Sequence, residues 1–179
     1  MTERIDRDLR NFRRWIRDPV ERLLKQKHAG FALAMISFPV LERLVRGKSG
    51  ASDRQTNQPF YSALTNCFPA LCDPPSGKFQ YVAQVFWQGF RNGILHQATF
   101  SAKPAKVQGN AQRAAFCVFH PRTGVAIEVR ALKRVIIVDP FAFSETVLDL
   151  IESDFDSYRK AEQVRHDLAF EHGPWIVSI

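Results

Sequence analysis

An arginine, an asparagine and a histidine stand close together near the middle of the chain. Arg91, Asn92 and His96 lie within six residues of one another. A histidine with an ordinary pKa of about 6.5 can accept the proton of a ribose 2′-hydroxyl. An arginine offers a permanently charged fork to the phosphate as negative charge builds. The expected product of that chemistry is a 2′,3′-cyclic phosphate.

The spacing of the three residues leaves their mutual orientation open. On a regular helix, at roughly 100° per residue, Arg91 and His96 point about 140° apart, whereas Asn92 and His96 share a face. Gly93 or the end of the helix must adjust this angle if Arg91 and His96 act together. The alternative interpretation is structural: Arg91 makes an ion pair, Asn92 hydrogen-bonds the backbone, and His96 closes a helix, where the dipole favours a cationic ring.

The string Arg91-Asn92-Gly93-Ile94-Leu95-His96 resembles the Arg-x4–6-His motif of the HEPN superfamily (higher eukaryote and prokaryote nucleotide-binding domain). In that motif a polar residue, often asparagine, follows the arginine. The resemblance covers the motif and, more loosely, the helical layout around it. It implies a metal-independent endoribonuclease in which His96 is the general base or acid, Arg91 stabilises the transition state and Asn92 is a positioning residue. It also implies a homodimer with two motifs facing one cleft, and a toxin or defence role with a nucleotidyltransferase-type antitoxin as a candidate partner.

Other pairs compete with this motif, and enzymatic activity is left open. Two of them fit the looser spacing of the family: Arg22 with His28, and Arg165 with His172. We prefer the pair at 91–96 because it lies in an aromatic-rich predicted helix, with Asn92 after the arginine and small and aliphatic residues between. A second hypothesis, from a different class, is a non-catalytic HEPN-like module that binds RNA, a nucleotide or a partner protein.

The charge of the chain is unevenly placed. The net charge of +7 divides into +4 in residues 1–28, +9 in residues 29–138 and −6 in residues 139–179. The acidic C-terminal stretch can dock on the basic body as ordinary surface or cover part of an anion-binding face. A basic, acid-poor stretch after the motif is the predicted RNA-contacting surface, the alternative being an ordinary solvated face. Its residues are Lys103, Lys106, Arg113, Arg122, Arg130, Lys133 and Arg134.

The elements that must position these residues are mostly helices. Apolar residues at helical spacing predict them. One helix covers 5–16, and a second restarts or kinks at Asp18-Pro19. A central buried helix begins at Phe31, is interrupted near Pro39 and ends at Gly47. A short helix covers 60–68, and a helix over 78–96 carries the motif. Four aromatic side chains on these stripes are expected in the core: Trp15, Phe86, Trp87 and Phe90.

After the motif the pattern changes from helix to strand. Residues 114–119, 125–130 and 134–138 predict a three-strand meander with a hairpin at Pro121-Gly124. Helical spacing returns from Phe143 to about Phe170, with one break. The predicted fold is α+β, mainly α: a single HEPN-like domain over 1–179, a helical bundle with a small antiparallel β-meander (about 111–138) inserted before the last long helix.

Composition narrows the remaining classes of protein. Cys67, Cys72 and Cys117 are odd in number and lack Cys-x-x-Cys spacing, so we expect buried free thiols in a reducing compartment. The other histidines form no metal-ligand pattern, and we expect neither a metal site nor a cofactor. The charged N-terminus is unlike a secretory signal, and the longest apolar run is too short to cross a bilayer. We therefore expect a cytoplasmic protein with no membrane partner.

Overall fold

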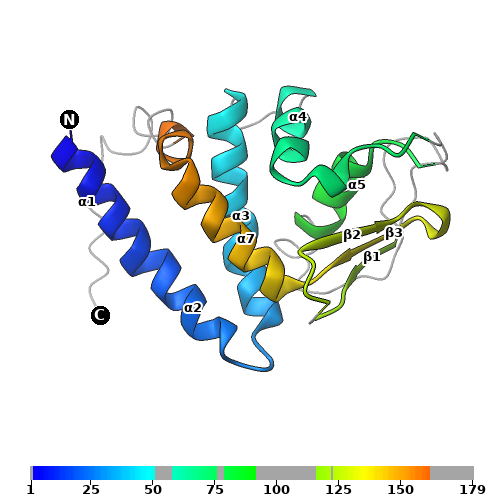
Figure 1. Ribbon diagram of the computed structural model, residues 1–179, viewed down its shortest axis with the longest axis horizontal. Helices are drawn as coiled ribbons and strands as arrows, with labels where there is room; N and C mark the ends of the chain where they lie inside the picture. The colour runs from blue at the N-terminus through cyan, green and yellow to red at the C-terminus, as the bar shows by residue number, and fades with distance from the viewer. Residues whose placement is uncertain (1, 51–57, 76–78, 92–115, 122, 162–179) are drawn as a thin grey trace, which may run out of the picture.

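The computed structural model describes residues 2–50, 58–75, 79–91, 116–121 and 123–161. A long bent helix at one edge of the molecule begins the chain (Figure 1): α1 (Thr2–Phe12), a π-helical turn (Arg13–Arg17) and α2 (Asp18–Leu24) follow one another without a gap. The predicted restart at Asp18-Pro19 is confirmed, since α2 begins at Asp18 after the π turn, and the backbone stays helical through the junction. The wide π turn contains Trp15, which lies four residues before Pro19. In a regular helix the ring of Pro19 would clash with the carbonyl of Trp15.

Helix α3 (Gly30–Ser49) is the central helix, and it is longer and more continuous than expected. It passes through Pro39 without interruption and ends at Gly50, whose φ is +62°. Gly47 does not end the helix, and its lack of a side chain serves packing instead. A Cβ atom at Gly47 would stand 1.7 Å from the carbonyl oxygen of Ser157. The glycine therefore lets the C-terminal segment cross α3 in close contact.

The middle of the chain forms short helices beside α3. Helix α4 (Gln58–Cys67) confirms the predicted short helix, and a 3-10 turn (Pro69–Leu71) follows it. Helix α5 (Val82–Phe86) continues into a second π-helical turn, η3 (Trp87–Arg91). The predicted helix over 78–96 is thus confirmed between 82 and 91, but it is wrong at residues 79–81, which are described and not helical; residues 78 and 92–96 lie outside the described part of the chain.

The three strands form a mixed sheet. Strands β1 (Phe116–Phe119), β2 (Ile127–Arg130) and β3 (Val135–Val138) lie in the order β1-β3-β2. Strand β2 is antiparallel to β3, but β1 is parallel to β3. The predicted antiparallel meander and its hairpin at 121–124 are therefore wrong, although the three strands themselves are confirmed. Every residue of β3 is apolar and three of its four are buried, so β3 takes the centre, where it is covered on both sides.

The last described helix begins earlier than expected. Helix α7 (Pro140–Ser153) starts directly after Asp139, whose side chain accepts hydrogen bonds from the amides of Phe141 and Ala142. The helix breaks at Asp154, and a further helical segment covers 155–161. The predicted break is confirmed at Asp154, and residues beyond 161 lie outside the described ranges.

Aromatic rings fill the core between α3, α5 and α7. Phe38 of α3 lies within 4.8–6.1 Å, between ring centroids, of Phe86, Phe90 and Phe143. The expected burial of Phe86, Trp87 and Phe90 is confirmed. The expected burial of Trp15 is wrong, because its side chain is 67% exposed. The mainly helical α+β class is confirmed; a HEPN-like bundle remains an expectation.

The three cysteines differ in environment. Cys67 is buried and Cys117 is half-buried, but Cys72 is exposed, so the expectation of three buried thiols is wrong at that position. Burial raises the pKa of the Cys67 thiol, and raises that of Cys117 to about 12. Both thiols are therefore protonated and unreactive near neutral pH.

Candidate functional site

The structure describes where the predicted catalytic motif begins. Arg91 is the last residue of the π turn η3, described here by its backbone, while Asn92 and His96 lie outside the described residues. Four members of the predicted RNA-contacting stretch lie outside them as well: Lys103, Lys106, Arg113 and Arg122. The geometry between Arg91 and His96 therefore stays a prediction.

Phe90 fixes the backbone immediately before the motif. Its side chain is buried, with 3% exposed. The ring stacks on Phe38 of α3 at 6.1 Å and meets Phe86 of α5 at 5.4 Å. It also packs edge-on against Phe119 of β1 at 4.9 Å. Aromatic contacts from two helices and a strand thus hold Phe90, the residue directly before Arg91.

The described basic residues lie at the far end of the sheet from this anchor. Arg130, Lys133 and Arg134 surround the connection between β2 and β3, where Arg130 pairs with Val135. Phe119, which contacts Phe90, pairs with Val138 at the opposite end of the same strand. Since a strand rises about 3.3 Å per residue, the two ends are about 10 Å apart. These three cations are thus not gathered around the start of the motif.

Arg130 also has a local carboxylate partner. Its guanidinium donates to Glu128 at 2.7 Å, and both side chains are well exposed. This hydrogen bond lowers the pKa of the Glu128 carboxyl. A phosphate that bound Arg130 would have to compete with Glu128, which makes Arg130 a weaker candidate contact than its charge alone suggests.

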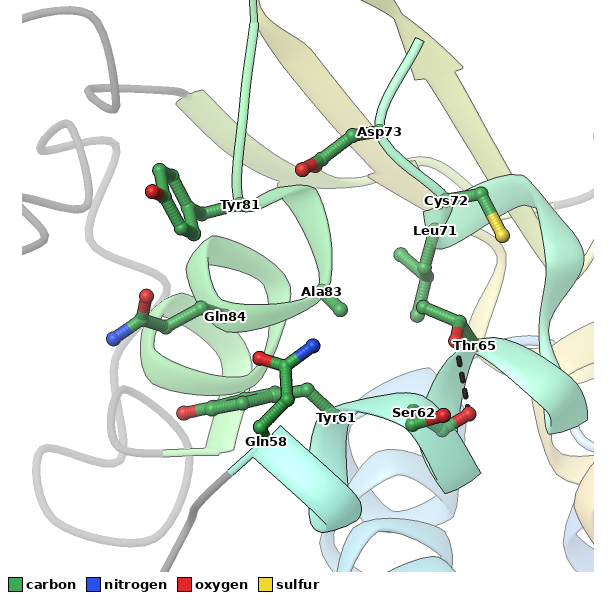
Figure 2. A pocket seen from close by; sticks show the side chains of 10 residues that line it. All are labelled: Gln58, Tyr61, Ser62, Thr65, Leu71, Cys72, Asp73, Tyr81, Ala83 and Gln84. Carbon is green, nitrogen blue, oxygen red and sulfur yellow. Dashed lines mark hydrogen bonds between the residues drawn. The ribbon is translucent and has the colours of Figure 1, made fainter.

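A polar pocket opens at the other end of the motif-bearing helix (Figure 2). Its cavity volume is about 420 Å³. Helix α4, the chain after the 3-10 turn and the start of α5 contribute to it. Its ten lining residues are Gln58, Tyr61, Ser62, Thr65, Leu71, Cys72, Asp73, Tyr81, Ala83 and Gln84.

Asp73 and Tyr81 give this pocket its shape. The Asp73 carboxylate accepts a hydrogen bond from the Val82 amide at 2.8 Å, which ties the chain after the 3-10 turn to the first turn of α5. Tyr81 precedes that turn with a φ of +59°, a left-handed conformation unusual for a tyrosine. The Tyr81 and Asp73 side chains lie at the same rim of the pocket in Figure 2. No motif in the sequence marks either residue, and the Asp73-Pro74 step signals only a helix break.

The side chains that line the pocket are suited to binding a ligand. Hydroxyl, amide, phenol and carboxylate groups line it, but no histidine, lysine or arginine does so among the described residues. The described part of its lining therefore offers no cation to a phosphate. The pocket lies at the first turn of α5, which begins at Val82, and Arg91 at the end of η3 follows nine residues later, about 14 Å away at 1.5 Å per residue. The pocket and the motif are separate features.

Neither a metal centre nor a membrane span emerges from the described ranges. Their His, Cys, Asp and Glu side chains form no cluster of three or more that could hold a metal ion. None of their helices combines the length and the apolar character needed to cross a membrane. No protein-family model, curated protein or solved structure matches the chain.

Proposed function

We propose that the protein is a metal-independent endoribonuclease of HEPN type that acts through Arg91, Asn92 and His96. In this proposal His96 takes the 2′-hydroxyl proton of the RNA or protonates the leaving oxygen. Arg91 neutralises the charge that builds on the phosphate, and Asn92 positions one of these groups. In this proposal the protein acts as a toxin or defence component, and a nucleotidyltransferase-type protein is the candidate antitoxin.

One observation supports the proposal beyond the motif itself. The residue directly before Arg91 is a buried phenylalanine held by rings from α3, α5 and β1. Catalytic groups need fixed positions, and a side chain gains precision when the core anchors its neighbour. The motif also begins on a π-helical turn, a rare geometry that is frequent at functional sites.

Incubation of the full-length protein with mixed RNA in EDTA tests the proposal. Wild type should cut the RNA and leave 2′,3′-cyclic phosphate ends, detected by end-group analysis. His96→Ala and Arg91→Ala should each lower the rate by about 100-fold or more, the usual loss when an acid, a base or a charge-stabilising group is removed.

The matched controls are Arg22→Ala and His28→Ala, because this pair has similar spacing and both side chains are exposed. Both controls should cut like wild type. Equal cleavage by wild type and His96→Ala would reject catalysis at this site. Binding of RNA without cleavage would favour the non-catalytic module instead.

The homodimer is the second part of the proposal. Light scattering should then give a mass of twice 20.5 kDa. If an arginine and a histidine from different subunits form each cleft, a mixture of Arg91→Ala and His96→Ala should recover part of the lost cleavage, since one site in each mixed dimer would be intact. No recovery in dimers shown to have exchanged subunits would place each site within one chain.

A further inference from the structure

Trp15 is an exposed tryptophan on the outer side of the first long helix. Its side chain is 67% exposed, whereas Trp87 is buried, with 3% exposed. The guanidinium of Arg14 lies 5.2 Å from the centre of the Trp15 ring. Tryptophan side chains are mostly buried in globular proteins, so an exposed one is informative. Surface tryptophans are often binding residues.

Arginines continue the surface on which Trp15 lies. Arg7, Arg10 and Arg14 are spaced three and four residues apart, so they share one face of the helix, and all three are exposed. Neither Arg10 nor Arg14 has a carboxylate partner among the described residues, and Arg7 is 4.0 Å from Asp8. We call Arg7, Arg10, Arg14 and Trp15 the outer stripe.

Two other arginines of the same helix, Arg13 and Arg17, are already engaged. Arg13 donates to Glu152 of α7 at 3.1 Å, and Arg17 contacts the same carboxylate at 2.7 Å. These two arginines hold the helix against α7. Among the described residues, Arg7, Arg10 and Arg14 make no ion pair with α7, so their charges are not what attaches the helix to it.

A hollow of about 310 Å³ lies beside Trp15. The 155–161 segment supplies Tyr158 to its wall, and the guanidinium of Arg43 lies 4.2 Å from the centre of that ring. Asp8 is the acid in the hollow, and Arg159 pairs with it at 3.0 Å. Aromatic and cationic groups therefore continue inward from the outer stripe.

We propose that the outer stripe binds single-stranded RNA, with Trp15 stacking on a base and the three arginines contacting phosphates. Arginine forks match phosphate oxygens, and base stacking on an aromatic ring is the common mode for single strands. The surface is distinct from the predicted basic stretch at 103–134. The choice of RNA as the occupant rests on the proposed function.

A membrane surface is the less favourable occupant for this helix. A helix that lies in a membrane interface buries its apolar face in lipid. Here that face packs on the protein: Phe12 is buried, and Leu9 and Ile16 pack against the core. What remains outside is one tryptophan among arginines, which complements a nucleic acid better than an acyl layer.

Fluorescence anisotropy with a short 2′-O-methyl oligouridine tests the surface, because this probe cannot be cleaved through a 2′-hydroxyl. The variant Arg7→Gln/Arg10→Gln/Arg14→Gln should bind at least tenfold more weakly than wild type. Its slope of log affinity against log salt should be shallower by about 2, since each single-strand phosphate contact contributes about 0.7.

The matched control removes three charges elsewhere. Lys25→Gln/Lys27→Gln/Lys160→Gln has the same net charge as the first triple variant, and all three lysines are exposed and lie outside the predicted RNA-contacting stretch. It should bind nearly like wild type. Equal weakening by both triple variants would overturn the outer stripe, because net charge alone would then explain binding.

Trp15→Ala tests the stacking contact separately. It should weaken oligouridine binding about fivefold or more, and Trp15→Phe should recover part of the loss, since a base stacks on either ring. Unchanged binding by Trp15→Ala would overturn the role of Trp15. Urea unfolding of each variant would show that the fold is kept.

Two further outcomes separate this surface from the cleavage site. His96→Ala should retain oligouridine binding, so a failure of the proposed ribonuclease would leave the outer stripe intact. Binding to vesicles that contain phosphatidylserine, lost in Trp15→Ala and without any binding of oligouridine, would overturn RNA as the occupant.

Discussion

Asp139 is a buried carboxylate that joins three parts of the fold. It is 1% exposed. One carboxylate oxygen accepts hydrogen bonds from the amides of Phe141 and Ala142 at the start of α7. The other accepts from the amide of Gly124 at 3.0 Å. Its backbone follows β3 directly, so a single residue connects the sheet, the turn before β2 and the last helix.

Replacing Asp139 should therefore destabilise the whole protein. Asp139→Ala removes the helix cap and leaves part-buried amides without their acceptor, and we expect a loss of about 2–4 kcal/mol in the free energy of unfolding. Urea denaturation followed by circular dichroism measures it. Glu145→Ala, at an exposed position of the same helix, should change stability by less than about 0.5 kcal/mol. Similar losses in both variants would contradict the role of Asp139.

At the scale of the element, the proline inside α3 carries a measurable cost. Pro39 lies in the middle of the helix, on its exposed side. Its missing amide leaves the carbonyl of Met35, four residues earlier, without the usual helical donor. The rest of the helix is held by its buried face, which includes Phe38 and Leu41. Tertiary packing thus outweighs the local preference of proline to end a helix.

Pro39→Ala should stabilise the protein by about 1–2 kcal/mol, because the regained helical bond exceeds the entropy that alanine adds to the unfolded chain. Thermal unfolding should show a higher midpoint. Pro59→Ala is the matched control: Pro59 is exposed and lies in the first turn of α4, where no helical bond is lost. A gain of equal size in both variants would show that unfolded-chain effects dominate.

At the scale of the whole molecule, opposite charges join regions far apart in the sequence. The first helix contacts the acidic C-terminal stretch through Arg13 and Arg17 on Glu152, and Asp8 in turn contacts Arg159. Lys48, near the end of α3, pairs with Asp154 at the break after α7. For these residues the acidic stretch docks on the basic body as ordinary surface.

The Lys48 pair predicts a specific loss of stability in acid. The hydrogen bond from Lys48, with a smaller contribution from Ser157, holds the pKa of Asp154 below its usual range. A lowered carboxyl pKa stabilises the folded state above the unfolded pKa of about 3.9, and this stability is lost as the pH falls through the folded pKa.

Wild type should therefore be more stable than Asp154→Asn at pH 7, and the difference should shrink below about pH 4. Urea unfolding at several pH values measures this difference. Lys48→Gln should lose much of the same pH-dependent contribution, because the main cause of the shift is gone. An equal difference between wild type and Asp154→Asn at pH 7 and pH 3 would contradict the assignment.

The local sequence pattern predicted most helices and strands, but few of the contacts between them. The spacing of apolar residues predicted the first helix, α4 and the three strands, because the period of apolar residues within a short segment indicates helix or strand. The order of the strands was not predicted, since β3 becomes central by contact with both neighbours. Gly47 was assigned to the wrong role because its partner, Ser157, lies far along the chain.

The candidate sites divide in the same way. The sequence by itself determined the charge distribution and the Arg91 to His96 motif, because both depend only on residue types and spacing. The tertiary structure decided that Phe90 anchors the start of the motif and that Arg130, Lys133 and Arg134 lie at the other end of the sheet. It also decided that Trp15 faces solvent beside arginines. Burial and neighbourhood depend on which faces α3 and α7 cover, and those contacts join distant segments.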